Sequence, residues 1–246
     1  MQRYSAEYER TINIWQASIL GENTVVRELL ADGEDVEAVC RDDRAEMNGR
    51  TALSFAATYD NLETVELLLE HGADANARSA GDQRTVLMAA AGSGHVTVAE
   101  TLVMAGADVN ATSARGMTAL MFAAAFGWPA VVRHLLRHGA LLATMDRNGH
   151  DAVWWARECV EDHELGSSET LAEGESRARE TLRIMELRVR WLCGMHKLLR
   201  IAPLVGRWSK YLRSLYEEVH FRPGGIGEKR CRAEFEALRG GDSENS

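Results

Sequence analysis

The chain repeats itself at intervals of 33 to 34 residues, and this period limits the possible folds more than any single motif does. Similar short segments begin at Thr51, Thr85, Thr118 and, in a decayed form, at Asp151. Each of the first three opens an Ala-rich run, which is followed by a turn, a second apolar run and a Gly-Ala pair. A unit of this length cannot bury its own apolar face, so several copies must stack and share a core.

The spacing inside each unit is as regular as the spacing between units. The turn after the first apolar run and the Gly after the second are twelve residues apart in three copies, from Asp60 to Gly72, from Gly94 to Gly106 and from Gly127 to Gly139. The same interval separates Gly21 from Gly33, with apolar residues between them. These intervals predict two helices in each unit and a degenerate first copy near the start of the chain.

Residue types at the expected helix ends support this interpretation. A Thr stands before each first helix, where its hydroxyl can accept an unpaired backbone N–H. The Gly after each second helix favours the left-handed backbone that ends a helix. Side chains suited to the turn into the next unit follow that Gly, and they are Asp74, Asn76, Asp108 and Asn110. Small Ala residues in the first helices allow neighbouring units to approach closely.

Together these features resemble the ankyrin repeat. The resemblance covers residues 11–160 and implies an ankyrin-repeat solenoid of helix-turn-helix units with finger turns. We expect an all-α fold in which a C-terminal helical capping region, outside the resemblance, follows this solenoid. We expect an N-terminal extension over residues 1–10 and a repeat domain over residues 11–160, with repeats near 11–44, 45–79, 80–113 and 114–146 and a degenerate one from 147 onward. The Pro and His that usually follow the Thr in this family are absent, which weakens local capping rather than the fold.

The first finger turn is longer than the others by about six residues, which include the charged run Cys40-Arg41-Asp42-Asp43-Arg44. A lengthened, charged surface loop is a candidate contact with a partner. A neutral insertion is an equally good explanation, because long surface loops cost little free energy.

The resemblance also implies where a partner binds: on the finger tips and on the inner, concave face of the first helices. Tyr59 and Phe126 are the expected energetic anchors, since aromatic residues flanked by Arg often dominate interfaces. The alternative for each is packing against the neighbouring repeat. The positions that match the family's contact surface are Met47, Asn48, Arg50, Thr58, Tyr59, Arg78, Asp82, Arg84, Ser93, Arg115, Met117, Phe126, Met145, Arg147 and His150.

Charge divides the chain, whose net charge is −9, into unequal parts. Residues 1–176 carry a net charge of −15, residues 177–213 carry +8 and the remainder carries −2. We interpret the acidic, Gly- and Ser-containing residues 161–176 as a mobile linker or an insertion in the fifth repeat. A basic helical region over 177–240 and a disordered tail over 241–246 follow. Opposite charge predicts intramolecular docking of the basic helices on the acidic repeats.

The basic region has a helical period of its own that ends at Pro203. Further amphipathic stretches are expected over 204–219 and 228–238. The preferred role is a cap on the open end of the solenoid, with Trp191 and Trp208 covering Trp154 and Trp155. The apolar stripe of the first helix is Ala178, Leu182, Met185, Val189, Leu192 and Leu199, with His196 at the one gap.

Other roles for this region remain open. A basic amphipathic helix can bind calmodulin or a membrane surface, here with Trp191, Leu198 and Leu204 as anchors. The stripe could also form a dimer, although His196 at the seam opposes that. Residues 198–215 could bind a ubiquitin-ligase core, but the Leu, Cys and Pro spacing expected of such a box is not matched.

Motifs for chemistry are absent from the sequence. The four cysteines are far apart, so neither a zinc site nor a disulfide framework is indicated. His134 and His138 have a spacing that can bind a metal, but ordinary histidines at a helix end explain them better. No Gly-rich segment has the neighbours of a phosphate-binding loop. We therefore expect no cofactor and no metal, and the alternative of a divergent enzyme in residues 177–240 is disfavoured.

The expected function is a non-enzymatic protein-binding module or adaptor whose partner is an unidentified protein. The acidic repeats disfavour nucleic acid, and no segment is apolar enough to cross a membrane. Scattered cysteines without a signal peptide predict a reducing compartment, either the cytoplasm or the nucleus.

Overall fold

The computed structural model describes residues 12–41, 49–164 and 169–201, and these residues form paired α-helices. No strand is present in the described residues beyond two isolated bridges. The all-α prediction is confirmed. The first helices of the pairs are α2 (Ile14–Leu20), α4 (Ala52–Thr58), α6 (Val86–Ser93), α8 (Ala119–Ala125) and α10 (Ala152–Glu164), and the second helices are α3 (Asn23–Ala31), α5 (Leu62–Glu70), α7 (Val96–Met104), α9 (Pro129–Arg137) and α11 (Glu169–Ile201).

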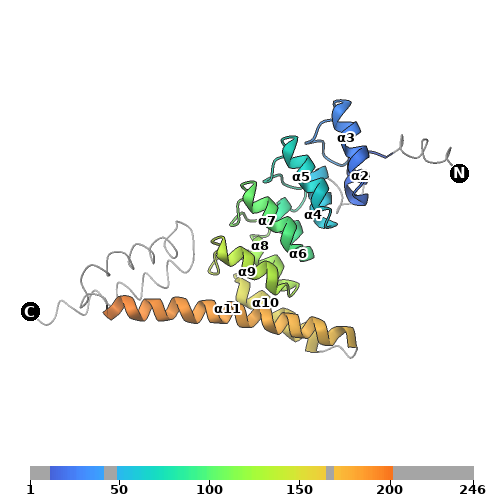
Figure 1. Ribbon diagram of the computed structural model, residues 1–246. Coiled ribbons are helices and arrows are strands. Elements are labelled where there is room, and N and C mark those ends of the chain that lie inside the picture. Colours follow the sequence, from blue (N-terminus) through green and yellow to red (C-terminus); the bar gives the residue numbers. More distant parts are fainter. Residues whose placement is uncertain (1–11, 42–48, 165–168, 202–246) are drawn as a thin grey trace, which may run out of the picture.

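The pairs stack in chain order into a solenoid of two helical rows (Figure 1). The first helices α2, α4, α6, α8 and α10 contact one another in sequence, and the second helices α3, α5, α7, α9 and α11 do the same. Each helix therefore packs against its own partner and against the equivalent helix of the next unit. The repeat-solenoid prediction is confirmed, and the degenerate first copy is a complete helix pair.

The first helices begin where the hydroxyl caps were expected. The Oγ1 atoms of Thr51, Thr85 and Thr118 accept the backbone N–H three residues later at 3.3–3.4 Å. In the decayed copy the carboxylate of Asp151 accepts the N–H of Trp154 at 2.8 Å. A side-chain cap satisfies one of the N–H groups that have no partner within a helix. The fifth unit therefore keeps the cap, although it has lost the Thr.

A residue in the left-handed conformation turns the chain between the two helices of a unit. It is Gly21, Asp60, Gly94 or Gly127, with φ values of 72°, 62°, 86° and 64°. Only Asp60 carries a side chain there, and Asp is one of the residue types that tolerate this conformation. The Gly after each second helix, at positions 33, 72, 106 and 139, is also left-handed, with φ between 83° and 91°. The twelve-residue spacing is the interval between these two left-handed residues of a unit.

The residue after this turn links each unit to the one before it. The amide of Asn61 donates to two carbonyls at the end of α2 at 2.7 and 2.9 Å. At the equivalent positions, Nε2 of His95 lies 3.0 Å from the carbonyl of Thr58, and Nε1 of Trp128 donates to the carbonyl of Gly92 at 2.9 Å. Three different side chains thus satisfy the carbonyls at the C-terminal end of the preceding first helix.

A second set of links lies in the turns that follow the second helices. The amide of Asn76 donates to Gly106 O at 3.1 Å and accepts the N–H of Asp108 at 2.7 Å. Asn110 makes the same pair of bonds to Gly139 and Leu141. These amides hold neighbouring units in register, which agrees with the turn role predicted for them.

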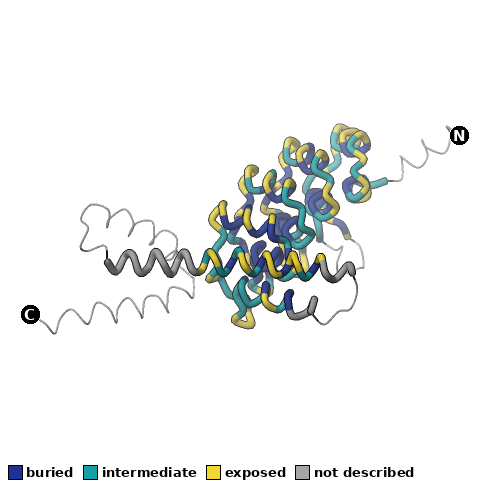
Figure 2. The backbone as a smooth tube through the Cα atoms, turned by 60° about the horizontal axis from the view of Figure 1, so that its bottom comes forward, coloured by how far each residue is buried: buried dark blue, intermediate teal, exposed yellow. Residues whose placement is uncertain are grey.

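Buried apolar residues fill the layers between units (Figure 2). Leu53, Leu87 and Leu120 hold one position in the first helices, and each is fully buried. Exposed residues gather at the tips of the turns (Figure 2). Stability therefore comes from contacts between adjacent units, as expected for a solenoid.

The fifth unit differs in length from the others. Helix α10 has 13 residues and α11 has 33, whereas the helices of the first four units have 7 to 9. Most of the acidic stretch 161–176, expected to be a mobile linker or an insertion, thus belongs to helices, with only 165–168 outside the described residues.

Helix α11 takes the place of a second helix and covers the end of the stack (Figure 1). Ala178, Thr181 and Met185 are fully buried, and Leu182 is partly buried against the core. The expected apolar stripe therefore holds as far as Met185. Val189, the next member, is 38% exposed. The described part of the C-terminal region acts as a cap, and it does so as part of the fifth unit rather than as a separate region.

Two ion pairs between this cap and the repeats have the opposite sense to the predicted attraction. Arg133 of α9 pairs with Glu180 of α11 at 2.6 Å, and Arg157 of α10 lies 3.7 Å from Glu186. In these two pairs α11 supplies the acid, and both pairs are well exposed and contribute little. A basic residue of α11 also contacts the repeats, because the guanidinium of Arg177 lies 4.5 Å from the centre of the Trp128 ring.

Several sequence predictions fall on residues outside the described ranges. They are the extension 1–10, the insertion around residues 42–48, the helices expected over 204–219 and 228–238, and the tail 241–246. Trp208 and Leu204 also lie there, and the side chains of Trp191 and Leu198 are not described.

Replacement of Met185 by Ala should lower the free energy of unfolding by about 2–5 kcal/mol, because it leaves a cavity under α11. Leu187→Ala, two residues away at a side chain that is 53% exposed, is the matched control and should cost less than about 0.5 kcal/mol. Urea unfolding followed by circular dichroism measures both. Equal effects would mean that α11 does not cover the stack.

Gly94→Ala should destabilise the chain more than Gly106→Ala, by at least about 1 kcal/mol. Both residues have positive φ, +86° and +91°, so both substitutions strain the backbone. A Cβ at position 94 would also lie 2.5 Å from the Trp128 ring, whereas one at position 106 would meet nothing within 4 Å. Thermal unfolding of the two variants checks this, and a larger effect at position 106 would contradict the close packing of Trp128.

Candidate functional site

The fingers, which join each second helix to the next first helix, form one connected row. Each finger closes on itself through a backbone bond, such as Ser79 N–H to Arg84 O at 3.0 Å. The N–H of Ala114 joins the second and third fingers by donating to Asp82 O at 2.8 Å, and the N–H of Arg147 joins the third and fourth by donating to Arg115 O at 2.9 Å. The backbones of these three fingers are therefore held in place before any partner binds.

Two arginines lie over phenylalanine rings at the start of the first helices. The guanidinium of Arg50 is 4.5 Å from the centre of the Phe55 ring, and that of Arg84 is 4.8 Å from the centre of the Phe122 ring. Arg84 reaches into the next unit, since its own unit has Ala89 where the second and fourth units have Phe55 and Phe122. Stacking of this kind adds cation–π attraction and shields the rings from water.

Arg50 is held in place more tightly than the other arginines of this surface. Its Nε donates to Ser54 Oγ at 3.1 Å, and its Nη2 donates to Ser54 O at 2.9 Å and to the hydroxyl of Thr58. Burial lowers the pKa of the Arg50 guanidinium from its ordinary value. The group is still charged at neutral pH, because an arginine titrates far above that range.

Asp82 stands between two arginines of neighbouring fingers. One of its carboxylate oxygens is 2.7 Å from Nε of Arg84, and the other is 3.6 Å from Nε of Arg115. The Arg115 side chain is 72% exposed. One carboxylate is thus shared by two cations, and this part of the finger row keeps an excess of positive charge.

The other end of the first helices carries a row of exposed apolar side chains. Leu20, Tyr59 and Phe126 occupy the same position, just before the turn, and are 58%, 52% and 57% exposed. Ser93 holds that position in the third unit and is half-buried. We call the surface from the finger arginines to this row the first-helix face. Leu20 was not among the predicted contacts, although the spacing that placed Gly21 in a turn could have identified it.

The predicted contact residues divide into three groups. Most of those described lie wholly or partly exposed on the first-helix face or the fingers, and they include Arg78, Met145 and Arg147. The prediction that Met117 contacts a partner is wrong, because this residue is buried in the core with only 7% of its surface exposed. Its unit has no Arg before the Thr, and an apolar side chain at that position packs inward. Met47 and Asn48 lie outside the described residues.

His150 packs within its own unit. Its ring stacks on Trp154 with centroids 3.5 Å apart, and Trp154 meets Trp155 edge to face at 5.0 Å. The carboxylate of Asp146, which is buried, accepts the backbone N–H groups of Asn148 and His150. These contacts explain the half-buried state of His150 and the fixed shape of the fourth finger.

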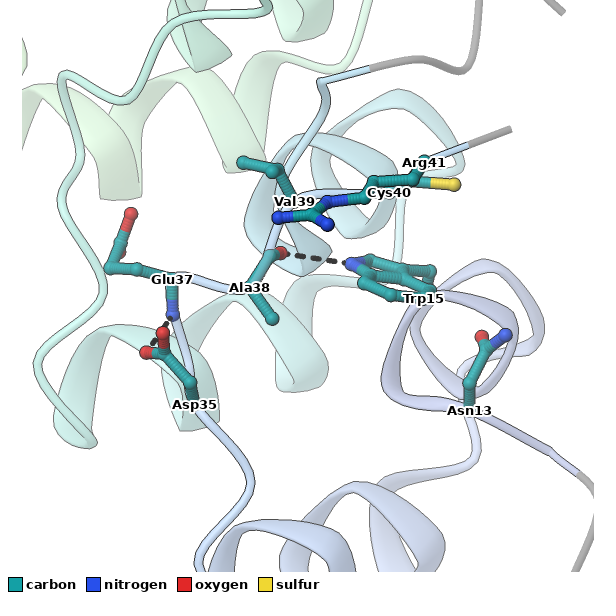
Figure 3. A pocket seen from close by; sticks show the side chains of 8 residues that line it. All are labelled: Asn13, Trp15, Asp35, Glu37, Ala38, Val39, Cys40 and Arg41. Atoms are coloured by element: carbon teal, nitrogen blue, oxygen red, sulfur yellow. Dashed lines mark hydrogen bonds between the residues drawn. The ribbon is translucent and has the colours of Figure 1, made fainter. Parts of the chain in front are cut away.

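A hollow of about 790 Å³ lies between α2 and the first finger (Figure 3). Its polar groups are already engaged in local structure: Trp15 Nε1 donates to Ala38 O at 2.9 Å, and the Asp35 carboxylate accepts the N–H of Glu37 (Figure 3). Cys40 and Arg41 complete the upper wall. The lining residues do not form a set of acid, base and nucleophile, so the hollow indicates no reaction.

Neither a metal cluster nor a membrane span is found in the described ranges. No three His, Cys, Asp or Glu side chains converge there as metal ligands would. The rings of His134 and His138 lie 4.4 Å apart on α9, and burial together with the neighbouring His138 lowers the pKa of His134. No described helix is both long and apolar enough to cross a bilayer.

Comparison with protein families agrees with this geometry. A family model described as "Ankyrin repeats (3 copies)" matches residues 14–113, and one described as "Ankyrin repeat" matches residues 115–147. The two matches cover four helix pairs and just over half of the chain. No curated protein matches the chain.

Proposed function

We propose that this chain, which belongs to the ankyrin-repeat family, is a non-enzymatic recognition module or adaptor that binds a partner protein on the first-helix face. Repeats of this family generally mediate interactions between proteins. The observation that carries this proposal is the row of exposed apolar side chains at one position of three units. Large apolar side chains gathered on a surface commonly mark an interaction site.

The architecture of this face suits recognition rather than catalysis. Fingers joined by backbone bonds hold charged side chains at one edge, and α4, α6 and α8 present small residues such as Ser54, Ala89 and Ala125 in the middle. A partner backbone could therefore approach closely between the arginines and the aromatic row. A rigid face of this kind loses little conformational entropy on binding.

Tyr59 and Phe126 are the proposed energetic anchors. More than half of each residue's surface is exposed, so packing within the stack leaves both side chains accessible to a partner. Phe126 also lies next to Gly92. Truncation of an aromatic anchor typically costs about 2 kcal/mol or more in binding free energy. Loss of both should remove most of the affinity for the partner.

The test compares partners captured by the full chain and by the double variant Tyr59→Ala/Phe126→Ala, measured by quantitative mass spectrometry. The variant should keep its helical circular dichroism, because it removes exposed side chains, and should lose at least about nine-tenths of the specifically captured partner.

The matched control removes two exposed apolar side chains from other surfaces, Met104→Ala/Leu187→Ala, which are 76% and 53% exposed. This control should capture the same partners as the wild-type chain. If the two double variants behave alike, the first-helix face is not the binding surface and the proposed function is wrong.

A further inference from the structure

The solenoid has a basic edge, although the chain as a whole is acidic. The tips of the second to fourth fingers, residues 78–84, 113–117 and 146–150, carry Arg78, Arg84, Arg115 and Arg147. Their acids are Asp82, which two arginines share, and Asp146, whose side chain is only 2% exposed. These tips therefore carry four arginines against two carboxylates that are already engaged.

Many exposed acids lie on the second helices, and examples are Glu28, Glu66, Glu70 and Glu100. The first helices, each roughly 10–12 Å across, stand between these glutamates and the first-helix face. The Debye length at physiological ionic strength is about 8 Å, so a ligand at the fingers experiences the nearby arginines more strongly than the distant acids.

Two of the finger arginines are held by specific contacts. Arg78 donates to Thr112 O at 2.8 Å across two fingers, and Arg84 lies over the Phe122 ring. Arg115 is 72% exposed, with its Nε 3.6 Å from Asp82. Planar guanidinium groups suit recognition of carboxylates, and the Asp82 carboxylate already pairs with arginines at this edge.

The spacing of the apolar row predicts how many residues of an extended peptide the surface can bind. Neighbouring helices pack roughly 8–10 Å apart, so two units separate Tyr59 from Phe126 by about 16–20 Å. An extended peptide advances about 3.3 Å per residue, so about five or six residues bridge the two aromatic side chains. Ser93, between them, leaves room for the peptide to pass.

Building on the proposed function, we propose that the partner presents an extended acidic peptide, whose carboxylates pair with the finger arginines while its apolar residues contact Tyr59 and Phe126. The arginines supply the charge specificity and the aromatic row supplies buried apolar area. Arg50 and Thr58 line the strip between these two parts of the surface and are joined by a hydrogen bond.

The experiment selects phage-displayed random dodecapeptides on the full chain and measures the best binders, made with fluorescein, by fluorescence anisotropy. The selected peptides should be net negative and carry apolar residues about five or six positions apart. Their affinity should fall as sodium chloride is raised, because exposed ion pairs are screened by salt.

Two charge-reversed variants distinguish an effect of the finger arginines on binding from an effect of the net charge of the chain. Arg115→Glu/Arg147→Glu should weaken binding of the selected peptides by about tenfold or more, since like charges in an interface repel. Arg27→Glu/Arg137→Glu makes the same change in net charge at exposed arginines of the second helices and should alter affinity by less than about twofold. Selection of neutral or cationic peptides, or equal losses in both variants, overturns the acidic-peptide proposal.

The proposed function and this inference can fail separately. Neutral peptides that lose affinity in Tyr59→Ala/Phe126→Ala but not in Arg115→Glu/Arg147→Glu would leave the proposed function standing and overturn the acidic partner. Peptides insensitive to both variants would overturn both. Binding of fluorescein-labelled oligothymidine as tightly as the best peptide, with the same loss in the arginine variant, would replace the peptide with a nucleic acid.

Discussion

The dependence of each helix pair on its neighbour underlies every other feature of this molecule. A single pair has only 7 to 9 residues in each helix in the first four units, too few to enclose an apolar core. The neighbouring unit supplies the missing half of the core and also hydrogen-bond donors for helix-end carbonyls, through Asn61, His95 and Trp128. Because these contacts fix the spacing and orientation of the units, they also fix the row of fingers and the row of apolar side chains. The surface is thus a direct product of the stacking.

Much of the fold could be predicted because its causes are local and recur. A Thr cap, a left-handed turn and a Gly terminator each leave a recognisable residue at a fixed interval, so Gly21 to Gly33 was enough to identify the first unit. The fifth unit was harder, because its helices are longer and its sequence no longer follows the period. The acidic residues 161–176 have the composition of a linker, but most of them belong to α10 and α11, helices that pack against α8 and α9 through other residues such as Ala178 and Met185.

The candidate site was predictable in position but not in detail. Exposure of Tyr59 and Phe126 follows from their place before the turn, and Leu20 shares it. Met117 shows the limit of this reasoning, because a contact position in one unit becomes a core position when Arg is replaced by an apolar residue. Nor could the sequence show that Arg84 would cross to Phe122, since this contact depends on Ala89 leaving space in its own unit. The charge argument had the same weakness: the balance over whole segments was correct, but ion pairs depend on individual side chains such as Glu180.

The long second helix of the fifth unit makes the C-terminal end of the stack different from the rest. Helix α11, with 33 residues against 9 in α9, covers the last unit and runs well past its edge (Figure 1). At this end the described stack closes with two helices that differ in length from those of the other four units. Units could therefore be duplicated or lost during evolution within the stack without disturbing its closure. A change in the number of units would lengthen or shorten the recognition surface, and the cover at the C-terminal end would stay the same.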